Sequence, residues 1–359
     1  MSGCPGSRPL SPDAVAEMIE SEGPSRDKDA VGRRMLLMGG CATAVAAVGI
    51  SKLSNARKES VFLARNQRYE HDLAKTIRDG LLSCGVSANA FRNRRVLLKP
   101  NMVEPRRTVP HMTTHPSVVV AAIEVFRDWG ATVLVGEASG HVRDTDMALL
   151  ESGIQAALDD TKTPFADLNY EDAVWVKNKG RVCPLEGFYF PESVASADFV
   201  VSMPKLKAHH WVGITAGMKN LYGTLPGIKY GWPKNVLHHA GIPETVHDIN
   251  ASLPSKLTIV DGILCMEGDG PIMGSPKHMG ILAVGKNLTS VDATLARIMG
   301  LDARRVPYLK IAADRMGPIC PRKIIQQGED WKGLVSPFEL IKYPHIQTMR
   351  DNNVGPEVT

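Results

Sequence analysis

The chain has 359 residues, of which 43% are hydrophobic and 22% charged, and these are the proportions of a globular protein rather than a disordered one. The formal net charge is only +4, and 6% of the residues are aromatic. Because nucleic-acid binding needs clustered basic residues and stacking aromatic side chains, this composition argues against a nucleic-acid partner.

The first 58 residues have the pattern of a disordered N-terminus followed by an export signal. Residues 1–30 are rich in Ser, Pro, Asp and Glu, and they precede the pair Arg33-Arg34. An uncharged apolar run over residues 35–50 and the small residues Ser54-Asn55-Ala56 come next, which is typical of a twin-arginine signal. We therefore expect a periplasmic or otherwise extracytoplasmic protein that meets the twin-arginine translocase during export. The alternative is a membrane tether through an uncleaved segment 35–50.

The cysteines are too widely separated for a metal or iron–sulfur motif. They are Cys4, Cys41, Cys84, Cys183, Cys265 and Cys320, and none belongs to a Cys-x-x-Cys pair. We therefore expect no iron–sulfur cluster bound by the chain itself. The four cysteines beyond the signal are compatible with a disulfide after export or with four small buried side chains.

Residues 59–335 alternate between amphipathic and fully apolar segments. The periodicity predicts helices over residues 69–82, 116–129 and 290–299, and strands over residues 96–98, 132–135, 199–203, 257–260 and 280–284. This alternation predicts an α/β fold with a mainly parallel sheet and helices on both faces, in one or two α/β lobes. Residues 172–192 are expected to form an insertion or an edge hairpin, and residues 336–359 a C-terminal tail.

Polar or glycine-bearing clusters follow several of the predicted strands. They are Lys99-Pro100-Asn101, residues 137–140 beginning with Glu137, residues 204–207 with Lys205 and Lys207, Asp261-Gly262, and residues 267–270 beginning with Glu267. Because ligands of such folds bind at the carboxyl ends of the strands, we expect these clusters to meet at one site.

The densest polar segment is residues 205–227, which holds His209, His210, Lys219 and Asn220 among four glycines. Glycines let the backbone approach a ligand, lysines attract carboxylate or phosphate, and histidines exchange protons near neutral pH. The alternative is a flexible surface loop, but the segment also contains many apolar residues.

Two further histidine-containing stretches have weaker signals. His115 precedes Pro116 at a predicted helix start, where it is expected to cap the helix, to hold an anion, or both. His238-His239 and His247 have no standard metal-ligand spacing, so they are not favoured as a metal site.

These motifs resemble those of the domain-of-unknown-function family numbered 362. The similarity covers most of residues 95–300 and depends on KPN at Lys99, THP at Thr114, PKLK-x-H from Pro204, GMKNLYG from Gly217 and VDG at Val260. The resemblance implies an α/β domain. It also agrees with a twin-arginine leader, which many relatives carry, whereas the ferredoxin-like modules of other relatives are absent from this sequence.

Residues 209–227 are also distantly similar to a segment of nickel-dependent lactate racemase and its relatives. In that family a histidine precedes a glycine-rich turn with a lysine, and the lysine tethers a nickel-pincer nucleotide. The resemblance implies that Lys219 is a tether or anion anchor and that His209 or His210 is a base. It also implies a metal ion or a nucleotide-derived cofactor, although Thr215 and Ala216 replace residues of the family pattern.

We therefore expect an exported enzyme that acts on a small anionic organic substrate by proton transfer. His209, His210 and Lys219 are the expected catalytic residues. The expected substrate-binding residues are Lys99, Asn101, His115, Glu137, Lys205, Lys207 and Asn220. Asp261 and Glu267 are expected to hold a metal ion or to orient a histidine. The alternatives are a non-catalytic exported protein that binds an anion or cofactor, and a redox subunit that docks with an iron–sulfur partner.

Overall fold

The computed structural model describes residues 58–313 and 315–351. The expected export signal, with Arg33, Arg34 and residues 35–50, lies outside the described residues. No helix within these two stretches is long and apolar enough to span a membrane.

The regular elements of the described chain alternate as the sequence predicts. The strands are β1 (Glu59–Ala64), β2 (Arg95–Pro100), β3 (Thr132–Glu137), β4 (Phe165–Asp167), β5 (Ala173–Lys177), β6 (Gly187–Pro191), β7 (Phe199–Met203), β8 (Lys205–His209), β9 (Gly213–Thr215), β10 (Ser255–Glu267), β11 (Ser275–Gly285) and β12 (Ile324–Gly328). The α-helices are α3 (Leu73–Ser83), α4 (Pro116–Asp128), α5 (Thr145–Ser152), α6 (Ile154–Thr161), α7 (Glu192–Ala195), α8 (Gly217–Asn220), α9 (Gly227–Tyr230), α10 (Asn235–His239), α11 (Ile242–Ser252), α12 (Leu288–Ile298), α13 (Pro307–Ala312) and α14 (Pro344–Gln347).

One mixed sheet organises the domain. Its main path is β12-β1-β11-β10-β7-β2-β3-β4, and β8 pairs with β10 and with β9. The strands from β10 to β4 along this path are parallel, whereas β11 is antiparallel to β1 and β10. The predicted α/β class with a mainly parallel sheet is therefore confirmed.

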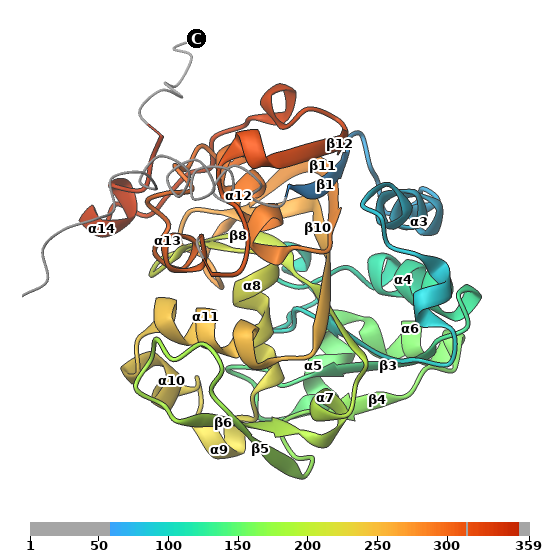
Figure 1. The fold of residues 1–359 in the computed structure, drawn as a ribbon. Helices are drawn as coiled ribbons and strands as arrows, with labels where there is room; N and C mark the ends of the chain where they lie inside the picture. Colours follow the sequence, from blue (N-terminus) through green and yellow to red (C-terminus); the bar gives the residue numbers. More distant parts are fainter. Residues whose placement is uncertain (1–57, 314, 352–359) are drawn as a thin grey trace, which may run out of the picture. The chain divides into compact units, whose positions relative to one another are not determined.

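Helices cover both faces of the sheet. Figure 1 shows α3, α4 and α6 on one side and α8, α11, α12 and α13 on the other. Each side has its own hydrophobic cluster, with Ile123 and Phe126 of α4 in one and Val246 and Leu295 in the other. The described residues belong to one compact unit, so the expected alternative of two lobes is not found.

Local sequence explains where the first two long helices begin. Helix α4 has Pro116 in its first turn, and the Nδ1 atom of His115 accepts a hydrogen bond from the Ser117 amide at 3.2 Å. The predicted helix from residue 69 starts later, at Leu73, because Asp72 caps it by accepting from the Lys75 amide at 2.8 Å. Tyr69 therefore lies before the helix rather than within it.

The structure differs from the sequence prediction at the C-terminal end. Residues 336–351 are not a separate tail, because Phe338, Ile346 and Met349 belong to the hydrophobic core. The predicted hairpin within residues 172–192 is present as the antiparallel pair β5 and β6. All four described cysteines are free; three are buried, and Cys320 is exposed.

Candidate functional site

A cavity of about 210 Å³ lies where β2 and β3 end, beside β8, β9, α8 and α10. Its polar and aromatic lining consists of Lys99, Asn101, Glu137, His141, Lys207, His209, His210, Trp211, Thr215, Lys219, Asn220, Tyr222, Lys234 and His238. The structure thus brings together eight of the residues expected at the site, from segments more than 100 residues apart. We call this cavity the lysine pocket.

Lys99 and Glu137 form a buried ion pair at the base of this site. The Lys99 Nζ atom lies 2.7 Å from Glu137 Oε2 and donates to Asn220 Oδ1 at 2.8 Å. Burial lowers the pKa of Lys99, and the Glu137 carboxylate opposes that shift. Gly223 permits this arrangement, because a Cβ atom there would lie 1.9 Å from Glu137 Oε1. Among the described residues that line the cavity, Glu137 is the one carboxylate.

Two other lysines direct all their N–H groups at the protein. Lys207 Nζ donates to Asn101 Oδ1 at 2.7 Å, and to the carbonyl oxygens of residues 112 and 271 at 2.9 and 3.2 Å. Lys234 Nζ donates to the carbonyl oxygens of residues 138, 222 and 225 at 2.8, 3.1 and 2.5 Å. Because an ammonium has three donors, neither group has a free donor for a ligand. Burial lowers the pKa of Lys234 to about 7, and burial together with the charge of Lys205 lowers the pKa of Lys207 well below its usual range. Lys207 thus lines the pocket as predicted, with its N–H groups directed at protein oxygens.

Lys219 differs from the other three pocket lysines. Within the described part of the chain its amine has no hydrogen-bond acceptor and no carboxylate partner, and it lies 3.9 Å from the centroid of the Tyr222 ring. Burial, assisted by the charge of Lys99, lowers the pKa of Lys219 to about 7. Its amine is thus available for binding or reaction near neutral pH.

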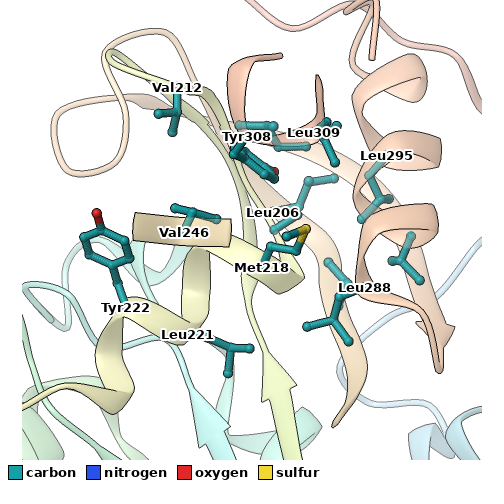
Figure 2. Packing of buried hydrophobic residues seen from close by; sticks show 14 of the residues in the cluster. Leu206, Val212, Met218, Leu221, Tyr222, Val246, Leu288, Leu295, Tyr308 and Leu309 are labelled. Carbon is teal, nitrogen blue, oxygen red and sulfur yellow. The ribbon is translucent and has the colours of Figure 1, made fainter. Parts of the chain in front are cut away.

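Helix α8 holds Lys219 through contacts on its opposite side. The Gly217 and Met218 amides donate to the carboxylate of Asp292 at 2.7 and 3.0 Å. A Cβ atom at Gly217 would lie 2.9 Å from Thr258 Oγ1, so the close approach of this turn requires glycine. Figure 2 shows Met218 near Leu206 and Leu288 in the hydrophobic core. Met218 and Leu221 anchor the turn in the core while Lys219 lines the pocket.

The two histidines of the predicted site have different hydrogen-bond partners. His209 Nδ1 accepts from the Trp211 amide at 3.1 Å, which places the proton of neutral His209 on Nε2. Burial, together with the charge of Lys219, holds the pKa of His209 well below its usual range. His210 Nδ1 lies 3.1 Å from Asp269 Oδ1 and donates to it, which leaves Nε2 as an acceptor. His209 is therefore arranged as a hydrogen-bond donor and His210 as a base.

The pocket is also lined by residues that the sequence did not assign to it, namely His141, His238, Lys234, Tyr222 and Thr215. Burial, followed by the charge of Lys219, lowers the pKa of His238 to about 4. The Thr215 hydroxyl is buried and has no partner among the described residues. Lys234 has φ of 70°, a conformation that a side-chain-bearing residue rarely adopts outside constrained sites. The sequence signal for these residues was weak, because only the pair His238-His239 stood out.

Lys205, Asp261 and His115 lie outside the pocket in a closed polar cluster. Lys205 Nζ pairs with Asp261 Oδ2 at 2.5 Å and donates to the Tyr69 hydroxyl at 2.9 Å. The His115 amide donates to Asp261 Oδ2 at 2.9 Å, and the His115 ring stacks on Tyr69 at 3.7 Å between centroids. Burial raises the pKa of the Tyr69 phenol. Lys205 and His115, which were predicted to bind the substrate, therefore do not line the lysine pocket but belong to this separate cluster.

The arrangement also argues against the expected metal role of Asp261 and Glu267. Asp261 is occupied by the partners just described, and Glu267 pairs with Lys277 at 3.1 Å. In residues 58–313 and 315–351, no three His, Cys, Asp or Glu side chains are grouped to hold a metal ion. The cavity of about 210 Å³ is also smaller than the range of roughly 300–1,000 Å³ that is usual for larger ligands. The described residues do not fit a protein-held metal or a nucleotide-sized cofactor as they stand.

Fold and site together define an α/β protein with a lysine-lined pocket at the carboxyl ends of its parallel strands. The chain belongs to the family described as Domain of unknown function (DUF362), whose model matches residues 96–297. This confirms the family that its motifs resemble.

The known proteins that are similar to this chain include the following two. The thylakoid-associated protein sll1697 of Synechocystis sp. is 30% identical over 265 residues, which cover 72% of this chain and 80% of that protein. The lactate racemase apoprotein from Thermoanaerobacterium thermosaccharolyticum is 11% identical, with a TM-score of 0.43 over 68% of this chain and 57% of that chain. This chain spans little more than half of that racemase.

Proposed function

We propose that the protein is an enzyme that binds a small anionic organic substrate in the lysine pocket and moves a proton to or from it. The observation that carries this proposal is the free amine of Lys219 in a cavity with four lysines and one carboxylate. A bound anion favours the charged form of such amines, so a concave site rich in lysines attracts small anions.

The dimensions of the pocket favour a substrate of a few heavy atoms. A volume of about 210 Å³ corresponds to roughly seven water molecules at about 30 Å³ each. Lys219 and the remaining N–H group of Lys99 are available to an anionic oxygen, because only two of the three N–H donors of Lys99 have protein acceptors. Trp211 and Tyr222 supply apolar surface for the rest of the molecule.

Lys219 and His210 are the groups best placed to accept a proton. A pKa of about 7 leaves the Lys219 amine partly neutral at working pH, which is the condition for efficient general base catalysis. His210 is oriented by Asp269, with its Nε2 atom free to accept. His209 would instead donate from Nε2 to an oxygen of the substrate, because its Nδ1 atom is occupied.

Deuterium exchange tests this proposal without knowledge of the product. Short 2-hydroxy and 2-oxo acids would be incubated with the protein in D₂O, and exchange at the carbon next to the carboxylate or carbonyl would be followed by NMR. We expect exchange with the wild type, loss of exchange with Lys219→Met, and no change with Lys229→Met. Lys229 is the matched control, because it is exposed and also lies over a tyrosine ring, at 5.3 Å from the centroid of Tyr189.

A non-catalytic binding protein is the alternative outcome of the same experiment. If the acids bind in a Lys219-dependent manner but no C–H bond exchanges, the pocket is a binding site and the enzymatic proposal fails. If no member of the series binds, the anionic substrate class itself is refuted.

We also propose that the protein is exported through the twin-arginine route, with Arg33 and Arg34 as the recognised pair. Fractionation of cells that produce the wild type or Arg33→Lys/Arg34→Lys tests this. We expect the wild type outside the cytoplasm and the variant inside it. Because one relative is thylakoid-associated, the membrane fraction should be assayed as well, where retention would indicate the tether formed by residues 35–50.

A further inference from the structure

The four lysines of the pocket divide into three that are held by the protein and one that is not. Lys99, Lys207 and Lys234 each donate to at least two protein oxygens, whereas Lys219 donates to none within the described chain. A pocket that attracts its ligand by charge alone would not require one lysine to be without a protein acceptor. It singles out Lys219 as a reactive amine.

We propose that Lys219 is a nucleophile that forms an imine with the carbonyl carbon of a short 2-oxo acid bound in the lysine pocket. This inference rests on the proposed function, because it takes the same pocket and the same anionic substrate class and specifies the chemistry. A lysine reacts in this way only when its amine is unprotonated and close to the carbonyl.

The surroundings of Lys219 favour the unprotonated amine. The one carboxylate of the cavity lining, Glu137, is already paired with Lys99 at 2.7 Å, so it does not hold a proton on Lys219. The Lys219 amine lies 3.9 Å from the centroid of the Tyr222 ring, which attracts a cation more weakly than a carboxylate does. The pKa of about 7, set by burial and by Lys99, agrees with this geometry.

The pocket also contains donors without protein partners that suit the carboxylate of a 2-oxo acid. The hydroxyl of Thr215, a residue only 4% exposed, is buried without a partner among the described residues. The third N–H group of Lys99 and the Nε2–H group of His209 are further donors in the same lining. A buried hydroxyl without a partner costs free energy that a ligand oxygen would recover.

The step balances without an oxidant or a cofactor. The Lys219 nitrogen attacks the carbonyl carbon, and a C–N bond forms while a proton passes from nitrogen to the former carbonyl oxygen. That oxygen then takes a second proton, delivered from solvent through His210 Nε2, and leaves as water when the C–O bond breaks. The product is a protonated imine, and nothing has been oxidised or reduced.

Reductive trapping tests the inference on the full domain. Wild type, Lys219→Arg and the control Lys229→Arg would be incubated with pyruvate or glyoxylate and sodium cyanoborohydride at pH 7, digested, and mapped by mass spectrometry. We expect one major adduct, on Lys219, in the wild type and in Lys229→Arg, and only background labelling in Lys219→Arg. Site mapping on the wild type gives the answer even if Lys219→Arg does not fold.

Binding of lactate, which has no carbonyl group to react, separates the two proposals. If lactate and pyruvate both bind but pyruvate leaves no adduct on Lys219, the imine is refuted while the anion pocket stands. Adducts spread equally over exposed lysines also refute the imine. If neither acid binds, the proposed function fails together with the inference.

Discussion

Replacing Lys219 with methionine is expected to stabilise the fold while it removes function. The change keeps most of the side-chain volume against Tyr222 but deletes an ammonium whose pKa falls from 10.5 to about 7 on folding. This difference corresponds to roughly 5 kcal/mol, at about 1.36 kcal/mol for each tenfold change in proton affinity. Water penetration and bound counter-ions reduce such penalties, so we expect a measured gain of about 1–3 kcal/mol at pH 7.

The sign of the pH dependence follows from proton binding. Between pH 7 and 10.5 the unfolded chain keeps a proton on this lysine that the folded chain has lost, so the free energy of unfolding of the wild type rises with pH. The methionine variant lacks this contribution. The free energy of unfolding of Lys219→Met therefore exceeds that of the wild type by most at and below pH 7. This difference shrinks by up to about 1.4 kcal/mol per pH unit above pH 7.

Urea unfolding at pH 6.5, 8.0 and 9.5 measures this difference directly. The other pocket lysines are present in both proteins, so the comparison isolates Lys219 and its interactions with neighbouring charges. Lys229→Met is the control, and because Lys229 is exposed we expect it to leave the pH dependence unchanged. An advantage of Lys219→Met that is absent at pH 6.5, or that grows toward pH 9.5, would refute the electrostatic reasoning.

Three further substitutions test other parts of the structure. Glu137→Gln leaves the buried ammonium of Lys99 without its carboxylate at 2.7 Å, and we expect a loss of about 3 kcal/mol of unfolding free energy in urea titrations. Lys234→Met leaves three buried carbonyl oxygens without their donor, and we expect a loss of roughly 2–4 kcal/mol and protease sensitivity near residues 221–225. Phe338→Ala removes a side chain that is 1% exposed in the core, and we expect it to lower the free energy of unfolding by about 3 kcal/mol. Thermal unfolding would show this as a lower melting temperature. An unchanged melting temperature would mean that residues 336–351 are dispensable for stability.

Local patterns in the sequence predicted the elements that carry the site. The apolar runs at residues 199–203 and 132–135 gave strands β7 and β3, because buried parallel strands need apolar side chains on both faces. The rule that ligands bind at the carboxyl ends of such strands then placed Lys99, Glu137 and Lys219 together correctly.

The partners of each polar side chain could not be predicted in the same way. Lys205 and Lys207 occupy alternate positions of β8, so they share one face of the strand and look equivalent in the sequence. Their surroundings differ because Tyr69, 136 residues away, meets Lys205, whereas Asn101 meets Lys207. Such long-range contacts are set by the tertiary fold, which periodicity does not contain.

Lys234 was missed for a related reason. It stands alone after Trp232-Pro233, without a motif, and its importance comes from three carbonyl oxygens on other segments. Thr215 was noticed only as a departure from a family pattern, although its buried hydroxyl lacks a protein partner among the described residues.

Calorimetric titration of the wild type with lactate at pH 7.5, in two buffers of different ionisation enthalpy, tests the central claim most directly. An anion beside Lys219 favours its charged form, so binding is expected to take up protons. We predict saturable binding with net proton uptake for the wild type, and loss of both in Lys219→Met. Binding with no proton uptake, or binding that Lys219→Met retains at full strength, would contradict a pocket built around this amine.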